Sequence, residues 1–451
     1  MTEYDHVPEA ALVGSLRDYK GVAGSDLIER MSGFFEWQNR RREHDLWPYA
    51  RSTSTAPKAR CEAMTDAGRP IKGINFASQD YLSLSSHPKI KEAAIAAVEK
   101  YGVHSAGSAA LLGNTANSRE LEIVISDFLG GREVVLYPTG WSAGFGSVQG
   151  CVRPNDHVVL DILAHSCLQE GSRAATQNIH FHGHLNLEAL ERKLMRIREA
   201  DRENGILVVT ESLFSMHSDT PDLAAYRRIC DTYKATLLVD CAHDLGCIGE
   251  NGLGHMGLQN AMEAADIMIG SFSKTFASNG GFVAVRTRAA AEYYRYYSAT
   301  HTFSNALSPV QAATVLRAFD IVRSDEGKAL RRKLMDNIVL LRSEMAAAGL
   351  ETLGDPSPIV PVRVGTEALG RFAARRLANG GGIANLVEYP AVPQGNARFR
   401  FQVMAAHTTE DVKQVVAILS RAIREADVEM RLAHEGDKTR MMGSPAVERA
   451  A

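Results

Sequence analysis

A single lysine, Lys274, lies where the sequence offers the most chemistry, between a short apolar run and a pair of glycines. The apolar run covers residues 267–269, and the glycines are Gly280 and Gly281. A run of this length bounded by turn residues is typical of a buried strand, and open α/β sheets bind their ligands at such strand ends. Burial lowers the pKa of a lysine amine and frees its lone pair to form a Schiff base. From these residues alone, a Schiff-base lysine and a solvated loop lysine are equally good interpretations.

An acid and a histidine, Asp240 and His243, follow another apolar run at residues 237–239. A carboxylate at the end of a buried strand is costly unless it meets a cation or hydrogen-bond donors. A protonated pyridine nitrogen would be such a partner. An aspartate that caps the next helix and a histidine that is hydrogen-bonded in the core explain the same segment equally well.

Other polar residues also come after apolar runs. Gly140 and Trp141 follow one run and open a helical stretch, which suits an anion because free N–H groups and the helix dipole point toward it. The turn matches neither a dinucleotide-binding glycine pattern nor a P-loop, so a plain strand–helix turn is the simpler interpretation. His165 and Ser215 follow two further runs and offer a ring and a hydroxyl, although His165 alone is explained as well by a structural role.

Two arginines, Arg398 and Arg400, alternate with phenylalanines near the C-terminus. Residues two apart share one face of a strand, so both could point the same way and one could bind a carboxylate through two hydrogen bonds. The alternative is a half-exposed strand with a basic outer face. In chain order, an anion-binding turn, a histidine, a strand-end acid, a lysine and an arginine would make one site at one edge of a sheet.

The elements that must position these residues alternate between strand-like and helix-like from residue 71 to about residue 310. Helical spacing is clear at 187–198 and 222–233. This alternation predicts an α/β fold with a mostly parallel central sheet that carries helices on both faces. The strands expected in it are 134–137, 157–160, 206–210, 236–240 and 267–269.

Segments outside this region have other patterns. Residues 1–70 are expected to form an N-terminal arm with a helix at 26–42 and a polar, turn-rich stretch at 52–70. An arm without its own core is expected to pack on a partner subunit. The large α/β domain is expected to span residues 71–310.

A smaller α+β domain is expected at residues 311–430. It would hold a long helical segment at 311–348, strands at 359–364 and 399–403, and a final helix from Thr409. The tail at 431–451 is polar and shows no periodicity, so it is expected to be mobile.

The composition excludes several classes of protein. Hydrophobic residues make up 45% of the 451 residues and charged residues 23%, as in ordinary globular proteins. A net charge of −3 gives no reason to expect nucleic acid or an anionic membrane as a partner. No apolar run is long enough to span a bilayer, and no secretory signal is visible, so the cytoplasm is the expected compartment. The six cysteines are scattered without a CxxC pair, which predicts reduced thiols rather than disulfides or a metal site.

With these residues in place, the sequence resembles the α-oxoamine synthase family of pyridoxal 5′-phosphate enzymes. This family has the type I, aminotransferase-like fold. The resemblance runs from about residue 75 to about residue 420 and rests on motifs that follow one another in the family's order. They are NFASQDYLSLSSHP, GVHSAGSAALLGNTANSRELE, TGW, LAHSCL, TESLFSMHSDTPDL, VDCAHDLGCIG, SFSKTFASNGGFV, FSNALSP and RFRFQVMAAH.

The resemblance implies a role for each residue that contacts the cofactor ring. Lys274 would hold the cofactor as a Schiff base and later move the Cα proton. Asp240 would keep the pyridine nitrogen protonated, which makes the ring an electron sink. His243 and Ser215 would hydrogen-bond the ring oxygen, and His165 would stack on the ring.

The resemblance also implies the residues for the phosphate and the substrates. The backbone at Gly140 and Trp141 would bind the phosphate, together with the hydroxyl of Ser271 and that of Ser304 from a partner subunit. Because such a site is shared between subunits, a homodimer is implied. Arg400 would bind the carboxylate of the amino acid, and the other expected substrate-binding residues are Gln79, His104 and Ser105.

Some positions depart from the family pattern. Gln79 replaces an asparagine that helps orient the substrate carboxylate, His104 and Ala109 replace residues of the glycine-rich segment, and Ser118 replaces a frequent histidine. These four are expected near the substrate entrance, so they bear on substrate identity more than on reaction type. Cys241 stands where an acid is common.

The expected reaction is a decarboxylating condensation of a small amino acid with an acyl thioester, either acyl-CoA or an acylated carrier protein. It would yield an α-amino ketone, CO2 and a free thiol. One alternative is another type I reaction, such as transamination or carbon–sulfur lyase chemistry. A second is a non-catalytic regulator or partner subunit of the same fold, against which the intact Lys274 and Asp240 argue.

Overall fold

The computed structural model describes residues 7–443, with side chains to residue 432. Within these residues the central sheet has seven strands in the order β4-β10-β9-β8-β7-β5-β6. Only β10 runs antiparallel to its neighbours among the paired strands. The strands are β4 (Glu133–Tyr137), β5 (His157–Asp161), β6 (Ile179–His182), β7 (Ile206–Glu211), β8 (Thr236–Asp240), β9 (Ile267–Ser271) and β10 (Gly281–Val285).

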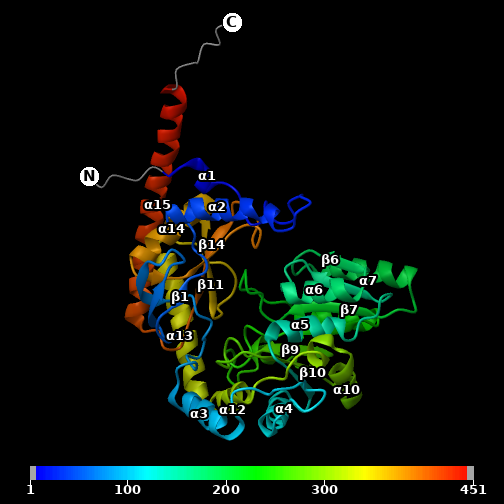
Figure 1. Cartoon of the computed structure of the whole chain (residues 1–451). Helices are drawn as coiled ribbons and strands as arrows, with labels where there is room; N and C mark the ends of the chain where they lie inside the picture. The colour runs from blue at the N-terminus through cyan, green and yellow to red at the C-terminus, as the bar shows by residue number, and fades with distance from the viewer. Residues whose placement is uncertain (1–6, 444–451) are drawn as a thin grey trace.

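Helices cover both faces of this sheet (Figure 1). Successive strand residues point to opposite sides, and here both sides are apolar, so each face needs a helical layer. Val134 and Leu136 join one apolar cluster, whereas Val135 and Tyr137 join the other. The mostly parallel sheet between helical layers is therefore confirmed. The helices of this region are α3 (Pro88–Tyr101), α4 (Ala116–Phe128), α5 (Gly140–Gln149), α6 (Ser166–Ala175), α7 (Leu187–Ala200), α8 (Leu223–Thr232), α9 (Gly254–Leu258), α10 (Arg288–Tyr297) and α11 (Ala299–Thr302).

The C-terminal region differs from expectation in its first helix. The segment expected as one helix forms α12 (Pro309–Arg323) and α13 (Asp325–Ala347), because Ser324 leaves the helical conformation and its side chain accepts from the N–H of Gly327. Such a hydroxyl cap begins a new helix. The other elements are β11 (Ile359–Gly365), α14 (Glu367–Asn379), β12 (Gly382–Ile383), β13 (Asn385–Val387), β14 (Ala397–Gln402) and α15 (Thr409–Gly443).

The polar stretch at 52–70 was expected to consist of turns, but it also contains strands. It holds β1 (Ser52–Thr53) and β2 (Arg60–Met64), and β2 pairs with β3 (Pro70–Asn75). Cys61 and Ala63 of β2 are buried while its other residues are exposed, so a period of two was present in a polar segment. β3 also pairs with β12, which joins this stretch to the C-terminal region.

The arm packs in part on its own chain, and its expected packing on a partner subunit stays a prediction. Its helices α1 (Glu9–Leu12) and α2 (Ser32–Glu43), with the short 3-10 helix Glu29–Met31 between them, lie beside α14 and α15 (Figure 1). The buried Arg371 of α14 donates to the carbonyl of Gly14 at 3.1 Å and pairs with Glu388 at 2.8 Å. Arg41 of α2 is also fully buried and donates to the carbonyls of residues 11, 13 and 14.

The helix α15 continues to Gly443, where the sequence suggested a tail without periodicity from residue 431. Residues 444–451 of that expected tail lie outside the described residues. No helix within residues 7–443 is both long and apolar enough to cross a membrane.

Candidate active site

Three neighbouring strands of the sheet, β7, β8 and β9, end side by side at the edge where Lys274 lies. Glu211 at the end of β7 is opposite Asp240 at the end of β8, and Asp240 is opposite Ile269 of β9. Lys274 follows three residues after the end of β9, in a turn. The carboxyl ends of parallel strands therefore bring the acids and the lysine together, as expected for a ligand site in this kind of sheet.

The side chain of Lys274 is half-buried, and its amine lies among acids. Burial lowers the pKa of Lys274, and the nearby carboxylate of Asp240 opposes this effect. A fully solvated loop lysine would show no such shift, so the Schiff-base interpretation fits this side chain better. A lysine with a lowered pKa has a larger fraction of neutral amine, which is the form that forms a Schiff base.

Asp240 is a buried carboxylate without a cation in direct contact among the described residues. One of its oxygens accepts from the N–H of Ala242 at 2.9 Å. Burial raises the pKa of Asp240, while the charges of Lys274 and His165 act in the opposite direction. No helix begins at this acid, since α9 starts only at Gly254, so helix capping does not explain it. A carboxylate in this setting suits a protonated ring nitrogen.

Glu211 also ends an apolar strand, but it is not among the site residues expected from the sequence. It is buried beside Asp240 and accepts from the N–H of His165 at 2.6 Å. Burial and the charge of Asp240 raise its pKa well above the ordinary value. A neutral Glu211 would fix the backbone of His165 without adding a second negative charge to the site. The signal that could have found it is the same one that marked Asp240.

His165 begins α6 and leaves part of its ring exposed. Its Nδ1 accepts from the N–H of Cys167 at 3.3 Å, which anchors one edge of the ring. Partial burial lowers the pKa of His165, and the charge of Asp240 opposes this. An anchored, mostly neutral ring with a free face can stack on a flat cofactor.

His243 is buried and its Nδ1 lies 3.0 Å from the hydroxyl of Tyr81. Burial, together with the charges of Lys274 and Arg400, lowers the pKa of His243 well below the ordinary value. The imidazole is therefore neutral and hydrogen-bonded on one side only among the described residues, which leaves its second nitrogen for a ligand. Tyr81 belongs to the motif NFASQDYLSLSSHP, and its contact with a residue 162 positions away is visible only in the fold.

The start of α5 approaches the end of β9 very closely. A Cβ at Gly140 would lie 2.3 Å from the Oγ of Ser271, so this position requires glycine. Thr139 and Ser142 form a capping box that uses their own N–H groups. The N–H groups of Gly140 and Trp141 remain for an anion at the positive end of the helix. Trp141 stacks on Phe145 with 5.2 Å between the ring centroids.

The two arginines of β14 share a face, as the alternating pattern predicts. Arg398 donates to the carbonyl of Met216 at 3.1 Å, and Nη1 of Arg400 lies 3.8 Å from the sulfur of the same residue. Arg398 is buried and Arg400 half-buried, which excludes a basic outer face. The charge of Arg400 acts on Lys274, His165 and His243, so this arginine belongs to the same site.

A cavity of about 720 Å³ opens beside Arg400 and extends under the arm. Cavities of this size that are mostly apolar with a few polar groups are the usual binding sites for small molecules. Apolar parts of its wall come from Leu16, Ala50, Ala63, Ile383, Leu386 and Val387.

A half-buried amine, a carboxylate for a ring nitrogen, a histidine for a ring face and an anion site at a helix N-terminus fit pyridoxal 5′-phosphate. Residues 71–419 of the sequence match the aminotransferase class I and II family. The chain belongs to the aminotransferase class I and II family.

Curated members of this family place the chain among the α-oxoamine synthases, as the motifs suggested. It is 32% identical to 8-amino-7-oxononanoate synthase of Thermoanaerobacter pseudethanolicus, over 79% of this chain and 89% of that protein. It is 30% identical to 4-hydroxy-2,2′-bipyrrole-5-methanol synthase PigH of Serratia sp., over 92% of this chain. The match spans only 63% of the length of that relative.

A solved family structure supports the fold across almost the whole chain. A serine palmitoyltransferase with a PLP internal aldimine has a TM-score of 0.83 and 25% identity, and the match covers 89% of this chain and 100% of that one. The type I fold predicted from the sequence is therefore confirmed.

Other expected site residues lie outside the group around Lys274. His104 and Ser105 lie in a loop that packs on residues 302–306, where Ser105 donates to the carbonyl of Ala306 at 3.0 Å. Ser304 is in that same segment. No hydrogen bond or ion pair within the described residues joins this surface to Lys274 or Asp240.

The remaining expected positions have mixed surroundings. Gln79 and Ser215 are half-buried, and Ser215 precedes Met216, which contacts both arginines of β14. Ser118 is buried in the first turn of α4 against the cap Thr115, so it is not at an open entrance. Ala109 accepts from the amide of Asn114, and Cys241 is packed in the apolar core.

Proposed function

We propose that this protein catalyses the decarboxylating condensation of a small amino acid with an acyl thioester. The acyl group becomes bonded to the Cα of the amino acid, the carboxyl group leaves as CO2, and the thioester sulfur leaves as the free thiol. The product is an α-amino ketone. The observation that carries the proposal is the position of the half-buried Lys274, which lies with Asp240, His165, His243 and Arg400 at one edge of the sheet. A non-catalytic partner subunit would have no need of that arrangement.

Pyridoxal 5′-phosphate is the cofactor, and the residues present fit it. Lys274 would bind it covalently, Asp240 would pair with the ring nitrogen and His243 would donate to the ring oxygen. The helix N-terminus at Gly140 and the hydroxyl of Ser271 would hold the phosphate. When bound, the cofactor supplies an electron sink for the Cα of the amino acid.

The protein's own groups perform the remaining work. Arg400 binds the carboxylate of the amino acid and so orients its Cα toward Lys274. The neutral amine of Lys274 takes the Cα proton, because burial keeps its pKa below the ordinary value. The acids around it stabilise the ammonium that results, and the same group can later return a proton to carbon.

A homodimer would complete the site. The loop with His104 and Ser105 carries highly exposed apolar side chains, and so does the segment with Ser304. They are Val103, Leu111, Leu112 and Phe303, which are 71%, 86%, 91% and 87% exposed. Exposed apolar groups gathered on one surface are typical of a subunit interface. Such an interface would bring Ser304 of the partner subunit to the phosphate.

A spectral titration tests the function. The purified protein with bound cofactor is titrated with glycine, alanine, serine and larger amino acids, first alone and then with an acyl-CoA. The proposal expects one small amino acid to change the visible cofactor spectrum and the change to decay when acyl-CoA is added. Accumulation of a keto acid without acyl-CoA would indicate aminotransfer instead.

Replacement of Arg400 by leucine is expected to weaken amino-acid binding by roughly 30-fold or more. Loss of one partner of a buried charge pair removes about 2–5 kcal/mol of binding free energy. The dissociation constant is read from the spectral titration. The matched control is Arg398→Leu, which removes a neighbouring arginine on the same strand. Equal losses from both variants would contradict the role of Arg400.

We place the acyl chain in the cavity beside Arg400. Ala63 is buried in its wall, so Ala63→Leu is expected to lower kcat/KM for long-chain acyl thioesters by roughly tenfold and to spare short ones. Ala346→Leu, at an exposed position of α13, is the control. If Ala63→Leu instead weakens amino-acid binding, the cavity holds the amino-acid side chain and the placement of the acyl chain is wrong.

A further inference from the structure

Gln402, two residues after Arg400 on β14, is a fully buried polar side chain that the site described above does not use. A buried amide requires partners for its oxygen and its nitrogen. Residues two apart on a strand share a face, so the amide of Gln402 lies beside the guanidinium of Arg400.

The orientation of this amide follows from its neighbours. With its oxygen toward Arg400, that oxygen accepts from Nε at 2.7 Å and from Nη2 at 3.0 Å. The opposite orientation would set the NH2 group against guanidinium donors. The other atom of the amide lies 3.3 Å from the hydroxyl oxygen of Tyr81. In the satisfied orientation this atom is the nitrogen, which donates to Tyr81.

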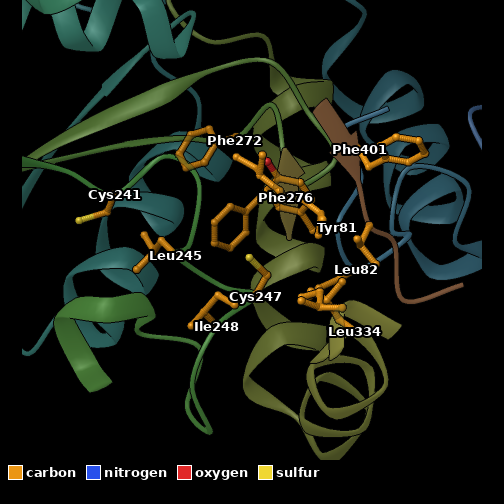
Figure 2. Packing of buried hydrophobic residues seen from close by; sticks show 14 of the residues in the cluster. Tyr81, Leu82, Cys241, Leu245, Cys247, Ile248, Phe272, Phe276, Leu334 and Phe401 are labelled. Carbon is orange, nitrogen blue, oxygen red and sulfur yellow. The ribbon is translucent and has the colours of Figure 1, made fainter. Parts of the chain in front are cut away.

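Tyr81 transmits this orientation to His243. Its ring is fully buried in the apolar cluster that also holds Phe276 and Phe401 (Figure 2). Since its oxygen receives the hydrogen of Gln402, its own hydrogen points to Nδ1 of His243, at 3.0 Å. A neutral imidazole that accepts at Nδ1 carries its proton on Nε2.

The charged and titratable groups around these side chains do not offer another donor for Nδ1. Those facing His243 are Lys274, Arg400 and His165, and those facing Tyr81 are Arg400, Asp244 and Cys247. Burial keeps the imidazole neutral, so the tautomer is decided by the hydrogen bond from Tyr81.

We propose that Gln402 is a positioning residue that holds Arg400 in place for the substrate carboxylate and, through Tyr81, fixes the proton of His243 on Nε2. The chain Arg400–Gln402–Tyr81–His243 thus joins the carboxylate end of the site to the nitrogen that would donate to the cofactor's ring oxygen. This inference rests on the proposed function, which identifies the ligand of Arg400 as the substrate carboxylate and that of His243 as the cofactor's ring oxygen. The hydrogen bonds between them belong to the protein itself.

A double-mutant cycle with Gln402→Met and Tyr81→Phe tests the chain of hydrogen bonds. The measured quantity is the pKa of the nitrogen in the bond between Lys274 and the cofactor, read from the visible absorbance as a function of pH. A donor to the ring oxygen draws negative charge away from that nitrogen and lowers its pKa. Each single variant is therefore expected to raise this pKa by roughly half a unit. The double variant is expected to shift it no further than Tyr81→Phe alone.

Amino-acid binding provides the second measurement. Gln402→Met is expected to raise the dissociation constant several-fold because it frees Arg400, whereas Tyr81→Phe leaves the contact of Gln402 with Arg400 in place and changes it less than twofold. Additive pKa shifts, no shift, or equal losses of amino-acid binding in the two variants would overturn the inference. Gln402→Leu repeats the measurements if the methionine variant does not fold. A wild-type protein without a visible lysine-bound band would instead contradict the proposed function.

Discussion

Lys274→Ala is expected to abolish turnover and to remove the visible absorbance of the lysine-bound cofactor. The variant loses both the covalent bond to the cofactor and the base for the Cα proton, and a positioned base alone contributes about 10²–10⁴-fold to the rate. Because the covalent bond is lost together with the base, we expect kcat to fall by roughly 10³-fold or more. Product formation from amino acid and acyl-CoA, together with the absorbance spectrum, measures both effects.

Two control variants separate the amine from its charge. Lys274→Arg keeps a positive charge next to Asp240 but cannot supply a neutral amine, so it is expected to be as inactive as the alanine variant. Lys413→Ala changes an exposed lysine of α15 and is expected to keep full activity. A Lys274 variant that still releases the α-amino ketone would refute the assignment.

Asp240→Asn is expected to lower kcat by roughly 10²–10⁴-fold with little change in shape. The removal of one partner from a buried charge pair costs about 3–5 kcal/mol, and here the partner would be the protonated ring nitrogen. Asp240→Glu keeps the charge and is expected to retain more activity than the asparagine variant. Equal rates in wild type and Asp240→Asn would contradict the pairing.

The same substitution is expected to have the opposite effect on the stability of the cofactor-free protein. Burial raises the folded-state pKa of Asp240 above its unfolded value of 3.8. The wild type therefore loses stability as pH rises from the unfolded pKa through the raised folded pKa, whereas asparagine does not titrate. Near neutral pH the cofactor-free asparagine variant should unfold at a higher temperature than the wild type. The cofactor-loaded variant should unfold at a lower temperature than loaded wild type.

The sheet was predictable because its central strands are apolar runs with an ionisable side chain at or just after their ends. β7, β8 and β9 are buried on both faces, so each reads as a continuous apolar run. An acid ends β7 and β8, and Lys274 comes three residues after β9. β6 has the sequence IHFH and lies at the edge of the sheet, where partial exposure removes the apolar signal. β2 was missed for the opposite reason, because its alternation consists of small residues and cysteine rather than large apolar ones.

The site was predictable at the ends of strands and not where contacts are long-range. Asp240, Lys274 and His165 each follow an apolar run, and the structure brings them together. Tyr81 lies 162 residues from His243 and 321 residues from Gln402, so only the fold shows that they touch. The arm could not be placed from its own residues, because the buried Arg371 that clamps it comes from α14, 359 positions later than Leu12.

Carbon dioxide and thiol counted together provide the most direct test of the central claim. The protein with bound cofactor is incubated with an acyl-CoA and with the amino acid that binds most tightly, labelled at its carboxyl carbon. The proposed function predicts one labelled CO2 and one free CoA thiol for each α-amino ketone formed, and no product from Lys274→Ala. A labelled keto acid formed without CO2 release or thiol would contradict it.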